Sequence, residues 1–269
     1  SEQETARSEV ALEQSHQLEP PTPFVGRKRE LAELMAWSTM ALEGLFFASI
    51  RCVMGAAGIG KRSLAAAFMR EWNARFADAP AFYWSFAIDP STDACERAMV
   101  DFFGGREARA RADTGDVRAA LQRVTGQRER VMVVLHYPEA HDHLESRWLP
   151  DFCQMLTQHH PGHRVLLVGR QWIYSEWPAE ALTLEPLAPA HVEEWVRQAL
   201  GDVMPPEARS AEAMAEAREL LLALSGGVPA VLQALIGEMK RGSILADVRD
   251  VFLGSGEPRA LSLAELREG

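Results

Sequence analysis

The residues best placed to do chemistry lie between positions 55 and 63, in the segment Gly-Ala-Ala-Gly-Ile-Gly-Lys-Arg-Ser. Gly55, Gly58 and Gly60 can adopt backbone conformations that are closed to residues with a Cβ. A loop of this kind can wrap successive N–H groups around a phosphate, and Lys61 can then reach the phosphate oxygens. The spacing therefore predicts a phosphate-binding loop.

The same loop departs from its pattern at the position that binds magnesium. The pattern G-x-x-x-x-G-K-[ST] places a hydroxyl directly after the lysine, where it is a ligand of Mg²⁺. Arg62 stands at that position, and the first hydroxyl comes one residue later, at Ser63. The sequence thus predicts that the phosphate cradle is retained and that one metal ligand is lost.

Length and composition limit the possible classes of protein. A chain of 269 residues that is 47% hydrophobic can bury a sizeable core, as one large domain or as a domain with a smaller helical lobe. No apolar run approaches the roughly 18 residues of a membrane helix, and the first residues show no basic-then-apolar signal pattern. Three widely spaced cysteines form no disulfide or metal pattern. We therefore expect a cytoplasmic protein without membrane contact.

The charge of the chain bears on its partners. A formal net charge of −10 argues against a dedicated nucleic-acid binder, which would normally show a basic face. A local group of arginines around Arg106 and Arg109 is diluted by Glu107 and Asp113, so we interpret it as a solvated helix face.

The elements that must position the glycine loop alternate between strands and helices. Residues 45–53 form a short apolar run that leads into the loop, and residues 62–76 continue with the periodicity of a helix. Uniformly apolar runs at 131–135 and 165–168 are typical of parallel strands covered on both faces. Aromatic residues 81–86 and a short segment at 182–184 complete the expected strands. The alternation predicts an α/β fold with a three-layer parallel sheet.

The chain divides by composition into four parts. Residues 1–23 are polar and acidic and end in Pro20-Pro21-Thr22-Pro23, which predicts a flexible linker. Residues 24–185 form the predicted nucleotide-binding domain. Residues 186–242 contain three helical patterns with no strand between them, which predicts a separate helical lobe. Residues 243–269 are interpreted as a short helix and a tail.

Several segments together resemble one family. The segment Phe24–Leu31 is similar to the F-V-G-R-x-x-E-L entry motif of the STAND class of AAA+-related ATPases, which includes the NB-ARC switches. Further segments resemble motifs of that class in the same order: Gly55–Leu64 its phosphate loop, Val131–Tyr137 its Walker B strand, Val165–Arg170 its sensor-arginine strand, Leu182–Leu187 its domain boundary and Ser225–Ala230 its G-G-L-P-L motif. Six weak motifs in the right order are a strong signal of this P-loop fold.

The resemblance implies how ADP or ATP would be held. The family's motifs place the backbone near Val25 and Gly26 beside the adenine, and Arg27 is expected among the nucleotide-binding residues. They place Arg170 at the γ-phosphate. They place Pro229 against the adenine, where it couples the helical lobe to the nucleotide. The loop residues that the resemblance places at the β-phosphate are Gly58, Ile59, Gly60 and Lys61, and it places Ser63 at the α-phosphate. From the loop pattern itself we also expect Gly55 and Arg62 among the nucleotide-binding residues.

A second departure from the family affects the metal. Where the Walker B strand of the family ends in an aspartate and a second acid, this chain has His136 and Tyr137. Mg²⁺ prefers oxygen ligands in octahedral geometry, so the loss of both protein anchors argues against Mg²⁺ binding and predicts very slow or absent hydrolysis. Glu139 and Asp142 follow closely and could substitute in part. The Arg62 guanidinium could instead offset phosphate charge without a metal, or it could point away from an empty loop.

Four functions follow as hypotheses. The favoured one is a nucleotide-responsive switch or oligomerisation module of a larger signalling protein, whose protein partners act through flanking effector and sensor domains or through self-association. The alternatives are an active ATPase, a nucleotide-free scaffold, and a DNA-associated ATPase, the last opposed by the acidic charge. His136 is interpreted as a polar strand-end residue, and His159, His160 and His163 as loop residues. Trp172 and Trp177 are left open between an exposed patch and a packing role.

Overall fold

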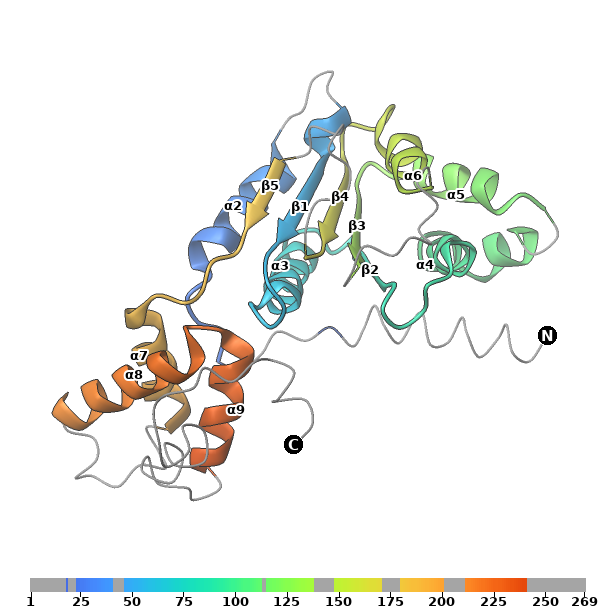
Figure 1. Ribbon diagram of the computed structural model, residues 1–269. Coiled ribbons are helices and arrows are strands. Elements are labelled where there is room, and N and C mark those ends of the chain that lie inside the picture. Colours follow the sequence, from blue (N-terminus) through green and yellow to red (C-terminus); the bar gives the residue numbers. More distant parts are fainter. Residues whose placement is uncertain are drawn as a thin grey trace. The chain divides into compact units, whose positions relative to one another are not determined.

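The computed structural model describes residue 18 and residues 23–40, 46–112, 115–137, 148–170, 180–200 and 211–240. The chain forms two compact units (Figure 1). The first contains residues 1–20, 29–56 and 61–184, and the second contains residues 21–28, 57–60 and 185–269. Several sequence predictions lie outside the described residues: the linker up to position 22 apart from residue 18, Glu139 and Asp142, Trp172 and Trp177, and the short helix within 243–269.

A parallel sheet of five strands forms the centre of the first unit, in the order β2-β3-β4-β1-β5 (Figure 1). All four strand pairings are parallel, so the carboxyl ends of the strands share one edge of the sheet. The predicted α/β fold is therefore confirmed. The strands are β1 (Ile50–Met54), β2 (Ala81–Ser85), β3 (Val131–His136), β4 (His163–Val168) and β5 (Glu180–Thr183).

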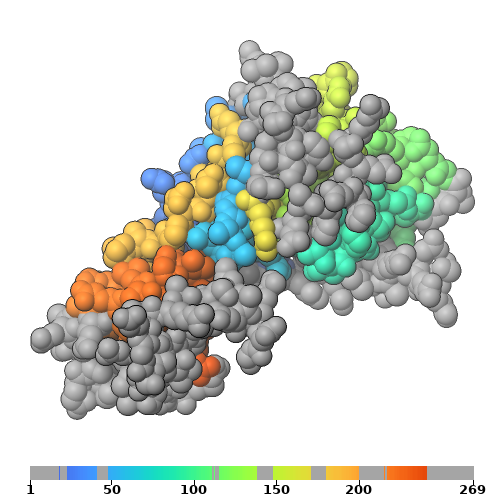
Figure 2. All heavy atoms as spheres, in the orientation of Figure 1, coloured from blue at the N-terminus to red at the C-terminus, as the bar shows by residue number. Residues whose placement is uncertain are grey.

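Burial follows the position of each strand in the sheet. Strands β2, β3 and β4 are buried at every residue, as their almost uniformly apolar sequences predict. The edge strand β5 is largely exposed. Figure 2 accordingly shows the golden atoms of β5 at the surface, beside the cyan atoms of the segment that begins with β1.

Helices flank these strands along the chain. They are α2 (Lys28–Thr39), α3 (Lys61–Arg75), α4 (Thr92–Ala112), α5 (Val117–Gly126) and α6 (Trp148–Thr157). Helix α3 buries the stripe Leu64, Phe68 and Trp72, whose spacing of four residues places them on one face. The Asp116 carboxylate accepts hydrogen bonds from the backbone N–H groups of residues 118 and 119 and so caps α5.

Two sequence predictions about local structure are wrong. The predicted strand 45–53 begins only at Ile50, because Phe46–Ser49 form a turn of 3₁₀ helix. His163 is not a loop residue but the first residue of β4, and it is fully buried. Its two ring nitrogens lie 2.8 Å from the Leu156 carbonyl oxygen and 3.2 Å from that of Arg128. Because these backbone carbonyl groups provide hydrogen-bond partners, the imidazole can be buried, and burial lowers its pKa.

The second unit has a helical core. Its helices are α7 (Pro189–Leu200), α8 (Ala211–Ser225) and α9 (Pro229–Lys240), with no strand among its described residues, as the helical-lobe prediction expects. Helix α8 ends at Ser225 and is followed by Gly226 and Gly227, both with positive φ. A Cβ at Gly227 would lie 2.6 Å from the Leu187 carbonyl oxygen, so glycine is required there. The core consists of Val25, Leu187, Val192, Trp195, Val196, Ala199, Leu221, Leu232, Leu235 and Ile236.

Across the described residues, none of the helices combines the length and the apolar character needed to span a bilayer.

Candidate phosphate-binding site

The glycine loop connects β1 directly to α3 and has the backbone that its sequence predicts. Gly55, Gly58 and Gly60 have φ angles of 144°, 73° and 97°, which residues with a Cβ rarely adopt. Helix α3 begins at Lys61, so the free N–H groups of its first turn lie at the end of the loop. Such a helix start attracts anions through its partial positive charge. The loop residues 57–60 belong to the second unit, and Gly55, Ala56 and Lys61 to the first.

Lys61 is held at the start of the loop. Its ammonium donates hydrogen bonds of 2.7 Å to the carbonyl oxygens of Gly55 and Ala56, and the residue is 8% exposed. Burial lowers the pKa of this ammonium, and the nearby positive charge of Arg170 lowers it further. The structure therefore brings the predicted residues Lys61 and Arg170 within electrostatic reach of each other.

Arg170 reaches this place because β4 and β1 are neighbours. Its backbone carbonyl accepts a hydrogen bond of 3.3 Å from the N–H of Gly55, and Gly169 donates to the carbonyl of Val53. The Arg170 side chain is exposed. The end of the predicted sensor strand is thus joined through the backbone to the first residue of the loop.

His136, at the position predicted to be that of the Walker B acid, is the last residue of β3 and is 7% exposed. Its Nδ1 lies 2.9 Å from the Ser85 hydroxyl at the end of β2. Burial lowers the pKa of His136 to about 4, with further contributions from the positive charges of Arg62 and Lys61. The imidazole is therefore neutral at pH 7. The interpretation of His136 as a polar strand-end residue is confirmed.

The two departures from the family pattern lie close to each other. The charge of Arg62 acts on His136 and also on Tyr83, whose pKa is raised by burial and lowered in part by Arg62 and Ser85. A magnesium ion would need carboxylate or hydroxyl oxygens at these two positions. Instead it would meet a guanidinium and a neutral imidazole, so the residues at these two positions do not fit Mg²⁺. An anion does fit beside Lys61 and Arg62.

Sequence reasoning did not single out Tyr83 and Ser85. For Ser85 the signal was its place at the end of a strand: it is the last residue of β2, and the carboxyl ends of parallel strands meet at one edge. Tyr83 lies in the middle of β2 and carried no such signal. The run Phe-Tyr-Trp-Ser instead predicted only a strand.

In the second unit, Arg27 fixes the middle of the loop. The residue is 5% exposed, and its guanidinium donates hydrogen bonds to the carbonyl oxygens of Ile59, at 3.1 Å, and Glu185, at 2.6 Å. The preceding Gly26 has a φ of 73°, and a Cβ there would lie 2.7 Å from the Leu187 side chain. Val25 packs in the helical core. The entry motif thus positions the loop through Arg27.

The same unit joins the loop to helix α9. The Gly58 carbonyl accepts a hydrogen bond of 3.1 Å from the N–H of Ala230, in the first turn of α9. A Cβ at Gly58 would lie 2.9 Å from the Ala230 Cβ, and one at Gly60 would lie 3.7 Å from Pro229. The second unit therefore brings together the predicted residues Gly58, Gly60 and Pro229. In the first unit, Ser63 is partly buried in the first turn of α3.

Comparisons with known proteins support the fold. No protein-family model matches the sequence, and no curated protein matches it. One similar solved structure is a STAND (signal transduction ATPase with numerous domains) protein with a tetratricopeptide repeat sensor from Pyrococcus horikoshii. It shares 16% identity at a TM-score of 0.53, and the match covers 87% of this chain and 33% of that protein.

Two further solved structures are ORC proteins. The ORC1 protein of Aeropyrum pernix in complex with DNA shares 16% identity at a TM-score of 0.55, over 82% of this chain and 62% of that one. Drosophila ORC bound to DNA shares 16% identity at a TM-score of 0.57, over 82% of this chain and 61% of that one. This chain thus spans about a third of the STAND protein and about three fifths of the ORC chains. At these identities the likeness shows the fold alone, which is the parallel α/β fold of the P-loop NTPases.

Proposed function

We propose that this chain is a regulatory nucleotide-binding module that holds ADP or ATP without a protein-bound magnesium ion and hydrolyses it very slowly or not at all. The observation that carries the proposal is the pairing of Arg62 with His136. They stand at the two positions where the family binds the metal, and each lies within electrostatic reach of the other. Because both positions that would bind the metal are replaced while the glycine loop is kept, we expect phosphate binding without metal binding.

The charges of the first unit support metal-independent binding. Lys61, Arg62 and Arg170 are all cations near the start of α3, and His136 is neutral beside them. A guanidinium matches two phosphate oxygens at once and keeps its charge at every physiological pH. Arg62 can therefore offset the charge that a magnesium ion offsets elsewhere. The site contacts proposed for the nucleotide are the glycine loop, Lys61, Arg62, Ser63 and Arg170, with Val25, Gly26 and Pro229 near the adenine.

The link between the loop and α9 supports a switching role. The Gly58 carbonyl binds the first turn of α9, and Arg27 ties Ile59 to Glu185, where the helical part of the second unit begins. A phosphate that reorients the loop would change these bonds. A ligand shifts such an equilibrium only by its difference in affinity for the two states. We propose that ADP and ATP differ in this way, and that the change exposes a surface for a protein partner or for self-association.

Calorimetry with and without Mg²⁺ tests the proposal. We expect the affinity of the purified chain for ADP to be the same in excess Mg²⁺ as in EDTA, and its affinity for ATP likewise. The variant Arg62→Ser should lose about tenfold in affinity in EDTA, because one charge-assisted contact is removed. The control Arg70→Gln changes an exposed arginine on the same helix and should bind as the unchanged chain does.

The same experiments separate the alternatives. Binding that requires Mg²⁺ would show that the metal site is intact and would contradict the proposal. Steady-state ADP production that Lys61→Ala abolishes would identify an active ATPase. If neither nucleotide binds, and chromatography of the denatured protein releases none, the chain is a nucleotide-free scaffold.

A further inference from the structure

A cationic cavity lies in the first unit, at the edge of the sheet where the amino ends of the strands meet. It has a volume of about 690 Å³ and is lined by Arg75, Arg128, Arg130 and Arg164, with Phe76 and His160 among its other residues. Arg130 precedes β3, Arg164 is the second residue of β4, and Arg75 is the last residue of α3. These positions are at the amino ends of the strands, whereas the glycine loop follows the carboxyl end of β1. We call this cavity the arginine pocket.

The positive charge of the arginine pocket is poorly compensated. Among the described residues, only one of its four arginines has a carboxylate within ion-pair distance: Arg130 lies 3.4 Å from Glu129. Arg128 and Arg164 donate to backbone carbonyl oxygens, and Arg75 contacts an aromatic ring. Carbonyl groups satisfy hydrogen bonds but do not neutralise a charge. The pocket therefore holds several cations and one acid, in a chain with a formal net charge of −10.

Arg164 is the most confined of these cations. The residue is 2% exposed and donates to the carbonyl oxygens of Pro161, His163 and Met40. Its Nε is buried and has no hydrogen-bond partner in the described part of the chain. A buried charged group without a counter-charge is costly, and burial lowers its pKa. An anion in the pocket would offset that cost.

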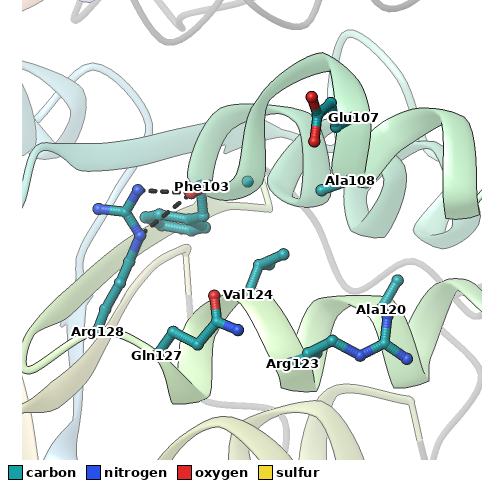
Figure 3. A pocket seen from close by; sticks show the side chains of 9 residues that line it. Phe103, Glu107, Ala108, Ala120, Arg123, Val124, Gln127 and Arg128 are labelled. Atoms are coloured by element: carbon teal, nitrogen blue, oxygen red, sulfur yellow. Dashed lines mark hydrogen bonds between the residues drawn. The ribbon is translucent and has the colours of Figure 1, made fainter.

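Aromatic rings hold the more exposed arginines in place. The guanidinium of Arg130 lies 4.8 Å from the centre of the Phe76 ring, and that of Arg75 lies 5.6 Å from it. Arg128 lies 5.5 Å from the centre of the Phe103 ring and donates two hydrogen bonds to the Phe103 carbonyl oxygen. The dashed lines in Figure 3 show these bonds; that figure draws a separate pocket between α4 and α5, which Arg128 also lines. Stacking on a ring leaves the edge N–H groups of Arg75 and Arg130 able to donate to a ligand, whereas two N–H groups of Arg128 already bind the Phe103 carbonyl oxygen. The pocket is thus preorganised.

We infer that the arginine pocket binds a small, multiply charged phosphate ligand. A phosphate monoester carries a charge of roughly −1.5 to −2 at pH 7, which suits a group of arginines better than a single carboxylate does. The cavity volume lies within the range of about 300 to 1,000 Å³ that is typical of small-molecule sites. Since the pocket is at the opposite edge of the sheet from Lys61, this ligand is bound separately from the nucleotide.

Inorganic tripolyphosphate is the probe that tests this inference. The experiment uses the full chain with Lys61→Ala, so that the glycine loop does not contribute, and measures binding by calorimetry in a buffer without phosphate. We expect one saturable site. Adding Arg75→Gln and Arg130→Gln should weaken it by about tenfold or more, because two charge-assisted contacts are lost. Adding Arg70→Gln, which changes an exposed arginine on α3 outside the pocket, should leave the affinity unchanged.

Each other outcome would overturn the inference. Tripolyphosphate that fails to bind the Lys61→Ala chain would show that the pocket holds no phosphate. An equal loss from Arg70→Gln would show attraction to surface charge in general. If a fluorescent single-stranded DNA of twelve nucleotides binds more tightly than tripolyphosphate, and the pocket variants abolish that binding, the pocket belongs to a nucleic-acid surface. Both altered arginines are exposed, so we expect each variant to keep the fold. Thermal unfolding of each variant checks this.

Discussion

The two edges of the parallel sheet both gather cations, but the chain builds them differently. At the carboxyl ends, Lys61 and Arg62 stand next to each other in sequence and lie beside a loop whose glycines have positive φ angles. At the amino ends, the arginine pocket draws its cations from α3, the segment before β3, and β4. The first edge depends on backbone conformation, whereas the second depends on side chains packed on rings and carbonyl groups.

This difference predicts how each edge tolerates change. A phosphate loop supplies N–H donors only in one backbone shape, and its lysine is a single ammonium without a substitute at the same place. The arginine pocket spreads its charge over several guanidinium groups, so each should contribute in part. We expect loss of binding at the loop from one substitution and a graded loss at the pocket.

The largest effect is expected from Gly162→Ala, which tests whether the backbone also constrains the amino edge. A Cβ at Gly162 would lie 2.1 Å from the backbone carbonyl oxygen of Glu129, so the segment before β3 would have to move. We expect the free energy of unfolding to fall by about 3 kcal/mol, as measured by urea denaturation.

Gly126→Ala is the matched control, since its Cβ would meet only the His160 ring, at 3.6 Å. It should leave stability within about 0.5 kcal/mol of the unchanged chain. Equal stability of the two variants would show that the close approach of Gly162 to Glu129 does not affect the free energy of unfolding. The amino edge of the sheet would then not depend on backbone conformation at this position.

Lys61→Ala should produce the next largest effect and should act on nucleotide binding alone. The lysine ammonium points into the loop, where it donates to the Gly55 and Ala56 carbonyl oxygens. We expect ADP affinity in EDTA to fall about 100-fold, because a charged group that makes more than one hydrogen bond to phosphate is removed. Arg70→Gln should show no change. A loss of less than about threefold would mean that the loop does not hold the phosphates through its lysine.

The sequence predicted the first edge well and the second not at all. The glycine loop is one continuous segment, so its spacing could be recognised before any fold was known, and the uniformly apolar β3 and β4 predicted the buried strands beside it. The arginine pocket is assembled from residues between positions 38 and 164, which only the strand order brings together. Its arginines are scattered, and the basic cluster that the sequence did suggest, around Arg106, lies elsewhere.

Smaller errors have the same origin. His163 was interpreted as a loop residue because three histidines surround a Pro-Gly pair, which is a turn signal. Its burial depends on carbonyl groups of Leu156 and Arg128, seven and 35 residues away. Likewise, the electrostatic contact of Arg62 with His136 joins two motifs that are far apart in sequence. Local patterns cannot report contacts of this range.

The free energy of unfolding should depend on pH because the pKa of His136 is lowered in the folded chain. Its pKa is about 4 in the folded chain, against an ordinary value of 6.5, so the unfolded chain binds more protons between these limits. Stability is therefore full above pH 6.5 and is lost as the pH falls toward 4. Between pH 6.5 and pH 5 we expect His136 to account for a loss of about 2 kcal/mol, since one pKa unit corresponds to about 1.4 kcal/mol.

Urea denaturation at these two pH values measures that loss. His136→Gln keeps a polar group near Ser85 but cannot titrate, so its stability should fall less on acidification than that of the unchanged chain. His163, whose pKa is also lowered, contributes to the same window in both proteins and cancels in the comparison. His159→Gln, a change at an exposed residue, serves as the control. Identical pH profiles for His136→Gln and the unchanged chain would contradict the neutral state assigned to this imidazole.

The smallest effect is expected from Arg130→Gln, and it separates folding from binding at the arginine pocket. The guanidinium is half-exposed, its pair with Glu129 lies at the surface, and its contact with the Phe76 ring is open to water. Exposed ion pairs and ring contacts of this kind each contribute about 0.5 kcal/mol. We therefore expect urea denaturation to show a change of less than about 1 kcal/mol. A loss of several kcal/mol would assign Arg130 to the stability of the sheet edge, and the free charge in the pocket would then be a by-product of packing rather than a site kept for an anion.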